Sequence, residues 1–344
     1  MAGRPGMNEL VPAAAALVGP GKGILAADES IGTVSARLAA AGVAPTAANR
    51  CAYREMLVTA PGLAIGISGV ILGAEAFRQR LRDGRPFPAA LADFGLMTGI
   101  RADVGTRALA GTRGETITEG LDGLLPRLRE YAGLGARFAV WRAVLRSGPG
   151  TPSPLAVRAN AHALGRFASE CQHAGLVAFV EPAVLTDGSR SLSQSETVTS
   201  VVLLEVMTSL DDYEVDFRGV VLRPTMVLPG GDVPATPAEV AEATTSTLNG
   251  LPTALAGVAF SSGGQHPERV TGNLAAMQHA LCLWPLTFAF GRGLTGPPLA
   301  AWRGEPGRMR AGQRALARRV SMNVAAVEGR YTADLECDLL PAVT

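Results

Sequence analysis

The chain has 344 residues, of which 47% are hydrophobic and 18% are charged. This length and composition allow a large buried core, which excludes an intrinsically disordered chain. Lys and Arg number 31 against 30 Asp and Glu, a net charge of +1, and this balance gives no electrostatic footprint for DNA, RNA or an anionic membrane. We therefore expect a small-molecule partner, with no nucleic acid and no membrane.

The first twenty residues and the last fifteen differ from the rest of the chain. Residues 1–20 predict an N-terminal helical extension and residues 330–344 a C-terminal tail. The apolar stretch VPAAAALV contains Pro12 and follows Glu9, so it is too short for a membrane span and makes a poor signal peptide. We expect a cytoplasmic protein.

Eight short apolar, β-branched runs follow, and segments with helical periodicity separate most of them. The helical candidates include residues 151–175 and 236–250, the second with Thr236 as N-cap and Pro237 as first helical residue. No linker-like composition divides residues 1–344, so we predict one α/β domain, a (β/α)8 TIM barrel. The apolar runs cover residues 24–30, 67–73, 94–100, 137–143, 176–182, 219–225, 257–262 and 286–292.

Polar residues lie at or just beyond the carboxyl ends of most of these runs. In a barrel these ends gather on one face, where active sites of this fold are built. The run at 219–225 is the clearest case, because it is apolar and ends in Arg223. A guanidinium at the end of a buried strand needs an anion or an open cleft beside it. The polar residues at the strand ends are Asp28, Glu29, Arg101, Asp103, Arg142, Glu181, Arg223, Ser262 and Arg292.

Two of these ends predict a phosphate site. SSGG at 261–264 contains Ser262 and Gly263, and FGRG at 290–293 contains Gly291 and Arg292. Glycines leave backbone N–H groups accessible, and a guanidinium is a fork-shaped donor for oxyanions. Loops after strands seven and eight often hold phosphate in this fold.

The cysteines and histidines indicate neither a disulfide framework nor a metal centre. The cysteines include no C-x-x-C pair, and the histidines fall in helical or loop segments without metal-ligand spacing. We expect reduced thiols, no metal and no cofactor. These residues are Cys51, Cys171, Cys282, Cys337, His162, His173, His266 and His279.

Several long motifs resemble the class I fructose-bisphosphate aldolases over essentially the whole chain. The resemblance implies a barrel, usually a homotetramer, that cleaves fructose 1,6-bisphosphate into two triose phosphates through a lysine Schiff base without a metal. The motifs are GKGILAADESIGTVSARLAAAGV (21–43), APGLAIGISGVIL (60–72), LAGTRGETITEGLDGL (109–124), WRAVLR (141–146), VEPAVLTDG (180–188), FSSGGQ (260–265) and LTFAFGRGL (286–294).

The residues that hold the substrate in that family have counterparts here. Asp28 matches the aspartate near the Schiff-base nitrogen, and Glu181 matches the principal general acid/base. The resemblance assigns contacts with substrate hydroxyl and phosphate groups to Ser30, Arg37, Arg142, Ser262 and Arg292.

The residues that carry the family's covalent chemistry are changed. Arg223 stands where the Schiff-base lysine is expected, before Pro224, and Val140 stands where a second lysine precedes the W-R pair. Arg101 corresponds to a third lysine and Ala183 to a second glutamate. The end of the chain, LLPAVT, lacks the terminal tyrosine of the eukaryotic-type family.

Arginine cannot replace lysine in an imine, because a guanidinium keeps its proton and offers no free amine lone pair. The chain's single lysine, Lys22, lies six residues before Asp28, which puts it roughly 20 Å toward the opposite end of the barrel. No lysine is therefore placed for Schiff-base chemistry.

We expect an aldolase-family protein that binds fructose 1,6-bisphosphate, a triose phosphate or a related anion without the standard lysine mechanism. One alternative is a non-covalent lyase, isomerase or condensing enzyme that uses Asp28 and Glu181 for acid/base work and Arg223 to stabilise an enolate or carboxylate. Another is a catalytically silent binding protein, in which Glu181 only provides the counter-charge for Arg142 and Arg223.

Overall fold

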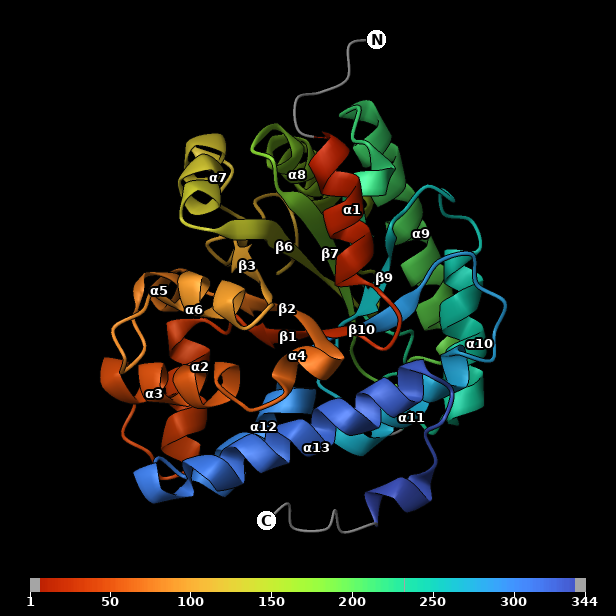
Figure 1. The fold of residues 1–344 in the computed structure, drawn as a ribbon. Coiled ribbons are helices and arrows are strands. Elements are labelled where there is room, and N and C mark those ends of the chain that lie inside the picture. Colours follow the sequence, from red (N-terminus) through yellow and green to blue (C-terminus); the bar gives the residue numbers. More distant parts are fainter. Residues whose placement is uncertain (1–6, 232, 338–344) are drawn as a thin grey trace.

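The structure is a computed structural model and describes residues 7–231 and 233–337. Eight parallel strands close into a barrel in the order β1-β10-β9-β8-β7-β6-β3-β2, with helices around it (Figure 1). The predicted TIM barrel is confirmed, and each of the eight apolar runs contains or overlaps one barrel strand. The strands are β1 (Gly23–Ala27), β2 (Ile67–Leu72), β3 (Met97–Arg101), β6 (Ala136–Ser147), β7 (Val177–Thr186), β8 (Val220–Leu222), β9 (Gly257–Phe260) and β10 (Leu286–Phe290).

The helices lie outside the barrel, and α13 crosses the lower part of the molecule in Figure 1. They are α1 (Met7–Leu17), α2 (Ile31–Ala40), α3 (Ala47–Val58), α4 (Leu63–Gly66), α5 (Ala74–Arg78), α6 (Phe87–Asp93), α7 (Leu124–Gly133), α8 (Pro154–His173), α9 (Leu192–Asp212), α10 (Pro237–Leu248), α11 (Pro267–Met277), α12 (Arg292–Trp302) and α13 (Met309–Val327). Three short 3₁₀ segments, η1 (Phe217–Gly219), η2 (Pro306–Arg308) and η3 (Ala333–Glu336), complete the described elements.

Capping residues set the N-terminal starts of the two helices that the sequence predicted. The Thr236 side chain accepts a hydrogen bond from the Glu239 backbone N–H, and Pro237 opens α10, as predicted. The helix predicted at 151–175 is shorter in the structure, because Ser153 caps it and α8 starts at Pro154. Short polar side chains at the N-cap satisfy backbone donors that the first turn leaves free.

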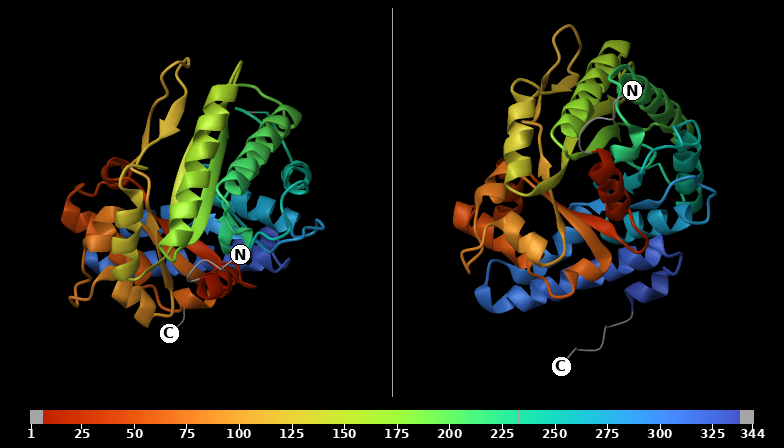
Figure 2. Two further views of the ribbon diagram at one scale, coloured as in Figure 1. Left: turned by 90° about the horizontal axis from the view of Figure 1, so that it is seen from above. Right: turned by 45° about the horizontal axis from the view of Figure 1, so that its top comes forward.

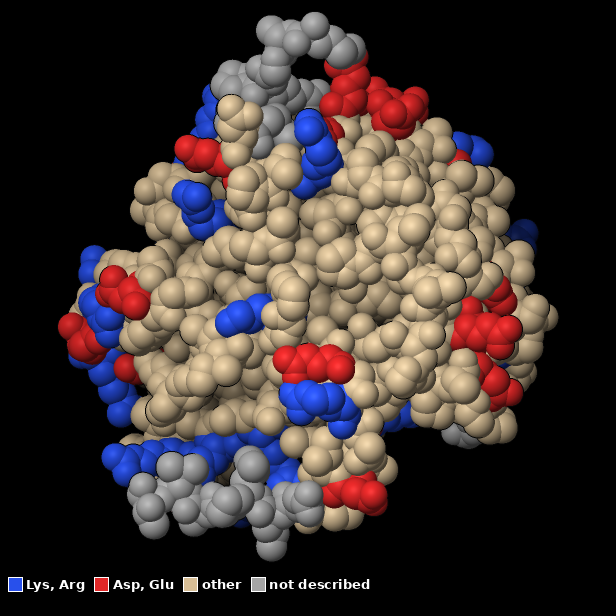
Figure 3. Space-filling model, turned by 45° about the vertical axis from the view of Figure 1, so that its right-hand side comes forward, with Lys and Arg blue, Asp and Glu red and all other residues tan. Residues whose placement is uncertain are grey.

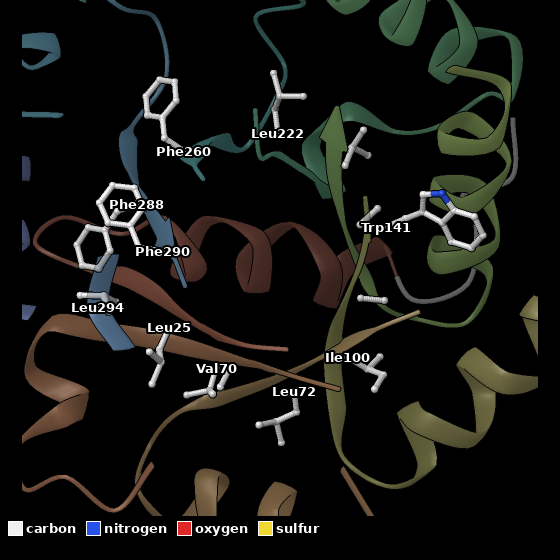
Figure 4. Packing of buried hydrophobic residues seen from close by; sticks show 14 of the residues in the cluster. Leu25, Val70, Leu72, Ile100, Trp141, Leu222, Phe260, Phe288, Phe290 and Leu294 are labelled. Carbon is white, nitrogen blue, oxygen red and sulfur yellow. The ribbon is translucent and has the colours of Figure 1, made fainter. Parts of the chain in front are cut away.

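Alternation along the strands separates two apolar layers. On β6, Phe138 and Val140 point into the barrel, whereas Ala139 and Trp141 belong to the layer between barrel and helices. Figure 4 shows Trp141 directed toward the surrounding helices, and its ring lies 5.6 Å from that of Phe167 on α8. Successive side chains of a strand point to opposite faces, so every second residue of a barrel strand faces its interior.

The helix α1 closes the amino end of the barrel. Its residues Leu10, Ala14 and Leu17 are buried in the same cluster as the interior side chains of the strands. A Cβ atom on Gly69 of β2 would lie only 2.9 Å from Leu17 Cδ2, so the helix packs directly against the strand. This helix belongs to the N-terminal extension expected at 1–20, whose residues 1–6 lie outside the described ranges.

The carboxyl ends of β6 and β7 differ from the expectation. These strands have 12 and 10 residues and stay paired as far as Ser147 and Thr186, several residues beyond the predicted runs. A small hairpin of β4 (Thr106–Ala108) and β5 (Thr116–Thr118) stands beside them and projects from the body in Figure 2. It was not predicted, because β4 is exposed and carries no apolar alternation.

Within the C-terminal tail expected at 330–344, residues 330–337 are described and contain η3. Among the helices of the described residues, none is long and apolar enough to cross a membrane. Uncharged side chains form most of the face in Figure 3, and basic side chains gather along its lower edge.

Candidate functional site

The alternation inside the barrel explains why charged residues gather at its mouth. Ala26 on β1 and Phe179 on β7 point inward, so Asp28 and Glu181, two residues further on, face the interior as well. The same spacing from Val221 places Arg223 inside the mouth. Along each of these strands, one inward-facing side chain is apolar and the inward-facing residue two positions later is charged.

These residues line one cavity of about 630 Å³ at the carboxyl ends of the strands. It brings together all the residues that the sequence predicted for the site except Arg37. The predicted residues in its wall are Asp28, Ser30, Arg101, Arg142, Glu181, Arg223, Ser262, Gly263, Gly291 and Arg292. Their placement defines a single site, whereas their individual roles stay predictions.

Arg37 lies beside the cavity rather than in its wall. Its guanidinium forms an ion pair with Glu29, donates to Thr295 Oγ1 at 3.2 Å and lies 5.9 Å from the Tyr53 ring centroid. Burial alone would lower the pKa of Arg37, but the nearby Tyr53 and Glu29 outweigh it and raise that pKa. Glu29 does line the cavity, so we expect Arg37 to orient Glu29 rather than to contact a ligand directly.

Glu181 lies between two guanidinium groups. Arg223 Nη1 donates to its Oε2 at 2.5 Å, and Arg142 Nε lies 3.2 Å from its Oε1. The Arg142 Nε–H is not aligned on that oxygen, so the second contact is an ion pair without a hydrogen bond. Glu181 is only 3% exposed. Both of its oxygens therefore face fixed positive charge.

The buried guanidinium of Arg223 has its partners on other strands of the barrel. It is 5% exposed, and besides Glu181 it bonds the backbone carbonyl of Ala289 on β10, at 2.8 Å from Nη2 and 3.3 Å from Nε. A buried guanidinium is tolerable when it is paired and hydrogen-bonded. The strand can therefore end in arginine because β7 supplies a carboxylate and β10 supplies a carbonyl.

A second charged group joins the ends of β1, β3 and β6. Arg101 Nε donates to both oxygens of Asp103, at 3.0 and 3.2 Å, and Arg101 Nη1 lies 3.7 Å from Asp28 Oδ2. The Asp103 carboxylate also accepts from the backbone N–H groups of Gly105 (3.1 Å) and Arg142 (3.3 Å). Sequence reasoning noted Asp103 at a strand end but did not identify this buried carboxylate as the support of two cavity arginines.

The charges in this group change one another's pKa values. Burial raises the pKa of Asp103, and the adjacent Arg101 offsets only part of that rise. Burial would lower the pKa of Arg101, but Asp103, Asp28 and Glu181 together raise it well above its ordinary value. Arg101 is therefore a permanent cation in the cavity wall.

The opposite wall has the features of an anion site. Gly263 and Gly264 have φ values of 58° and 85°, a left-handed conformation that glycine adopts without strain. Arg292 is the first residue of α12, and the first backbone N–H groups of a helix have no partner within it. Arg292 makes no ion pair or side-chain hydrogen bond with any residue in the ranges 7–231 and 233–337. Its guanidinium is therefore available to a ligand.

Neither Val140 nor Lys22 brings an amine to this site. Val140 is 1% exposed and belongs to the apolar interior below Arg142. Lys22 precedes β1 and donates to the backbone carbonyls of Ala64 and Ile65, the second at 3.0 Å. Asp28 follows the same strand, so Lys22 and the cavity lie at opposite ends of the barrel.

The structure adds cavity residues that the sequence did not single out. Gly105 and Thr106 come from the β4–β5 hairpin and the turn before it, and Val144 and Leu185 come from the extended parts of β6 and β7. The hairpin is fixed to β6 because Thr118 Oγ1 donates to the Arg142 carbonyl at 2.7 Å. The continuing apolar alternation of 137–147 was the one available signal for the longer strands.

Metal-ligand residues do not cluster in the described ranges. No group of three or more His, Cys, Asp or Glu residues in 7–231 and 233–337 is placed to hold a metal ion. The expectation of a metal-free protein stays a prediction.

A closed (β/α)8 barrel with a charged cavity at the carboxyl ends of its strands is the architecture of the TIM-barrel enzymes and their relatives. The chain belongs to the class-I fructose-bisphosphate aldolase family, whose profile matches residues 9–339. It is 45% identical over 329 residues to the cytosolic fructose-bisphosphate aldolase 5 of Arabidopsis thaliana, covering 94% of this chain and 92% of that protein. It is 44% identical over 328 residues to fructose-bisphosphate aldolase B of Gallus gallus, covering 94% of this chain and 90% of that protein.

A solved structure extends the likeness to the fold. The fructose-bisphosphate aldolase of Plasmodium falciparum, in complex with TRAP and a small-molecule inhibitor, matches with a TM-score of 0.93 and 38% sequence identity. The match covers 95% of this chain and 96% of that one. The family resemblance read from the sequence motifs is therefore confirmed.

Proposed function

We propose that this protein binds a phosphorylated sugar or triose phosphate, with the phosphate held by Ser262, Gly263, Gly291 and Arg292. The observation that carries the proposal is Arg292, an exposed guanidinium without an ion-pair partner in the described ranges, next to two glycine-containing loops. Guanidinium and backbone N–H groups together form the usual protein donors for phosphate oxygens. The names of the relatives, fructose-bisphosphate aldolases, support the same class of ligand.

Ligand-dependent melting tests this proposal. A ligand that binds only the native state raises the melting temperature, so fructose 1,6-bisphosphate at millimolar concentration should raise it for the wild type. Arg292→Ala should lose most of that shift. Arg310→Ala, which removes an exposed arginine of α13, is the matched control and should keep it. An unaltered melting curve of the wild type would contradict the sugar-phosphate site.

We further propose that the ligand is bound without a lysine Schiff base. The arginine at position 223 is charged and engaged by Glu181 and Ala289, and imine formation needs a neutral, nucleophilic amine. A member of this family would then cleave its substrate by another route or only bind it. A coupled aldolase assay on the purified protein discriminates, because activity comparable to that of ordinary aldolases would overturn this part of the proposal.

Two alternatives differ in the role of Glu181. A non-covalent lyase, isomerase or condensing enzyme needs Glu181 or Asp28 to move protons, with Arg223 stabilising an enolate or carboxylate. A catalytically silent binding protein needs Glu181 only as a counter-charge. The two guanidinium groups on the Glu181 oxygens favour the second alternative, because a buried guanidinium needs a paired carboxylate.

Assembly is also a proposal. We expect a homo-oligomer, a tetramer by resemblance to the family. The exposed side chains of Val201 (56%) and Leu204 (66%) on α9 support it, since an uncovered apolar helix face is typical of a subunit contact. Light scattering on the purified protein gives the subunit number directly, and a monomeric mass at micromolar concentration would contradict the expectation.

A further inference from the structure

A second cavity adjoins the proposed phosphate site. It has a volume of about 500 Å³ and lies at the carboxyl ends of β7, β8 and β9, on the same face of the barrel. None of the charged residues predicted from the sequence lines it, but it shares Leu185, Gly263 and Gly264 with the first cavity. A ligand held at the shared glycines could therefore reach into both.

The two shared glycines form the partition between the cavities. A Cβ atom on Gly264 would lie 3.1 Å from Nη2 of Arg292, which lines the first cavity. A Cβ atom on Gly263 would lie 3.8 Å from Thr225 Cγ2 and 3.9 Å from Leu228 Cδ1, which line the second. Two consecutive residues thus separate a free guanidinium from the apolar side of the second cavity.

One side of the second cavity is lined by apolar side chains. Val184 and Met226 are buried, and Leu185 and Leu228 are half-buried. The buried hydroxyl of Thr225 is satisfied within the protein, because it donates to the Val184 carbonyl at 2.9 Å. This side of the cavity therefore offers a ligand apolar contact rather than hydrogen bonds.

Several polar groups at the rim are engaged within the protein, whereas the exposed side chains of Arg269 and His266 have no hydrogen-bond or ion-pair partner within residues 7–231 and 233–337. The Gln265 amide oxygen accepts from Asn273 Nδ2 at 2.6 Å, and Arg146 pairs with Asp187 at 3.1 Å. Arg269 is exposed and makes no ion pair within residues 7–231 and 233–337. The rim is thus neutral to positive, which disfavours a cationic organic group and accepts an anionic ligand.

We propose that the two cavities form one binding site for a phosphate monoester with an apolar or aromatic organic group. The phosphate lies at Arg292 and the glycine partition, and the organic group lies against Leu185 and Leu228. This inference rests on the proposed anion site at Arg292 and goes beyond it, because a triose phosphate has no apolar part that would use the second cavity. The ligand class is therefore larger and less polar than a triose phosphate.

The affinities of three commercial probes test the inference. Inorganic phosphate measures the anion site alone, glycerol 3-phosphate adds a polar group of triose size, and phenyl phosphate adds an apolar ring. We expect phenyl phosphate to bind about tenfold more tightly than the other two, the factor that results when roughly 60 Å² of apolar surface leaves water. Titration calorimetry on the full-length protein gives all three dissociation constants.

Two substitutions at Leu228 locate the effect. Leu228→Trp fills the second cavity and Leu228→Ala removes its apolar wall, and either should abolish the preference for phenyl phosphate while inorganic phosphate still binds. Leu283→Trp adds the same bulk at a side chain that is 72% exposed and outside both cavities, so it should keep the preference.

The outcomes separate this inference from the proposed function. Equal affinity for the three probes, or a preference that survives both Leu228 variants, would overturn the joint site while leaving the anion site intact. Failure of all three probes and of fructose 1,6-bisphosphate to bind would overturn the anion site and, with it, the joint site.

Discussion

At the scale of single residues, the side chain at position 223 decides which chemistry the site can support. Arg223 shares the interior of the mouth with Glu181 and lies at the end of a strand whose preceding inward residue is Val221. A lysine there could lose its proton and act as a nucleophile, whereas a guanidinium with a pKa above ~12 cannot. Arg223 also forms a buried ion pair with Glu181, the carboxylate that one of the proposed alternatives uses for proton transfer.

Borohydride trapping tests the loss of covalent chemistry. Reduction of the wild type with dihydroxyacetone phosphate should give no covalent adduct, because no amine of residues 7–231 and 233–337 lies at the mouth. Arg223→Lys should give weak trapping, since Asp28 and Glu181 remain to assist imine formation. Adding Val140→Lys should strengthen it, because a neighbouring cation lowers the pKa of a lysine.

Intact-protein mass spectrometry distinguishes these outcomes. An adduct on the wild type would have to involve Lys22 or the N-terminal amine and would contradict the assignment. Arg223→Gln is the control, because it removes the guanidinium without introducing an amine and should trap nothing. The double variant is needed because Val140, in the apolar interior, supplies no amine cation beside a lysine introduced at position 223.

The counter-charge role of Glu181 has a consequence for stability. Glu181→Gln leaves the guanidinium groups of Arg142 and Arg223 without their shared anion. We expect the free energy of unfolding to fall by about 3–5 kcal/mol, the range for breaking a buried ion pair by removing one partner. Urea denaturation measures the change. Glu205→Gln on α9, outside this cavity, is the control, and an equally small effect of both changes would argue against a structural role.

At the scale of elements, an acidic residue in the short helix α5 holds that helix to α3. Glu75 accepts from Arg50 Nε at 3.0 and 3.1 Å and from Arg54 Nη1 at 2.7 Å. Hydrogen bonds from Arg50, opposed by burial and assisted by Arg54, lower the pKa of Glu75 from 4.5 to about 2. The ionised form of Glu75 is therefore stabilised by folding.

The pH dependence of this contact can be predicted with its sign. A carboxyl group whose pKa is lower in the folded protein stabilises it fully above its unfolded pKa and loses that contribution as the pH falls through the folded pKa. Glu75→Gln should therefore be less stable than the wild type at pH 6, and the difference should shrink as the pH falls from 4.5 to about 2. Chemical denaturation across this range measures it.

An exposed ion pair provides the control for Glu75. Glu130 pairs with Arg78, and both side chains are about half exposed, so Glu130→Gln should change the free energy of unfolding by less than about 1 kcal/mol. A difference between Glu75→Gln and the wild type that stays constant from pH 6 to pH 2 would show that the contact does not depend on the Glu75 charge.

Elements with local signals could be predicted from the sequence, and those set by tertiary contacts could not. The Thr236–Pro237 pair predicts the start of α10 because both residues act on the adjacent backbone. The β4–β5 hairpin has no apolar alternation, and it is held by contacts such as that of Thr118 with β6, 24 residues away along the chain. A single sequence does not reveal such a contact.

At the scale of the whole molecule, regular alternation predicts the barrel and therefore which residues meet at its mouth. Asp28, Glu181 and Arg223 lie far apart in sequence, yet knowing the fold was enough to place them together. What could not be predicted is the pairing within the mouth, such as Arg37 turning to Glu29 or Arg101 to Asp103. Where a charged side chain has several oppositely charged groups within reach, only the three-dimensional distances determine which of them it pairs with.

The prediction of one domain over residues 1–344 stays open to a direct test. We expect a single cooperative unfolding transition by calorimetry, because the barrel strands run from β1 to β10 in one closed sheet. Two separated transitions would indicate an independent unit within the chain. The helix α1 lies outside the repeated strand–helix units. Its role in that cooperativity can be tested with a single substitution.

Leu17 of α1 allows the contribution of that helix to be measured. Its side chain is fully buried where α1 closes the amino end of the barrel and contacts β2 beside Gly69. We expect Leu17→Ala to lower the free energy of unfolding by about 2–5 kcal/mol, because a truncated leucine in a packed core leaves a cavity. Leu204→Ala, at a side chain that is 66% exposed on α9, is the control and should cost about 0.5 kcal/mol or less in a monomer. Equal, small losses from both variants would mean that the barrel does not depend on this closure, and a larger loss from Leu204→Ala would instead indicate a subunit contact on α9.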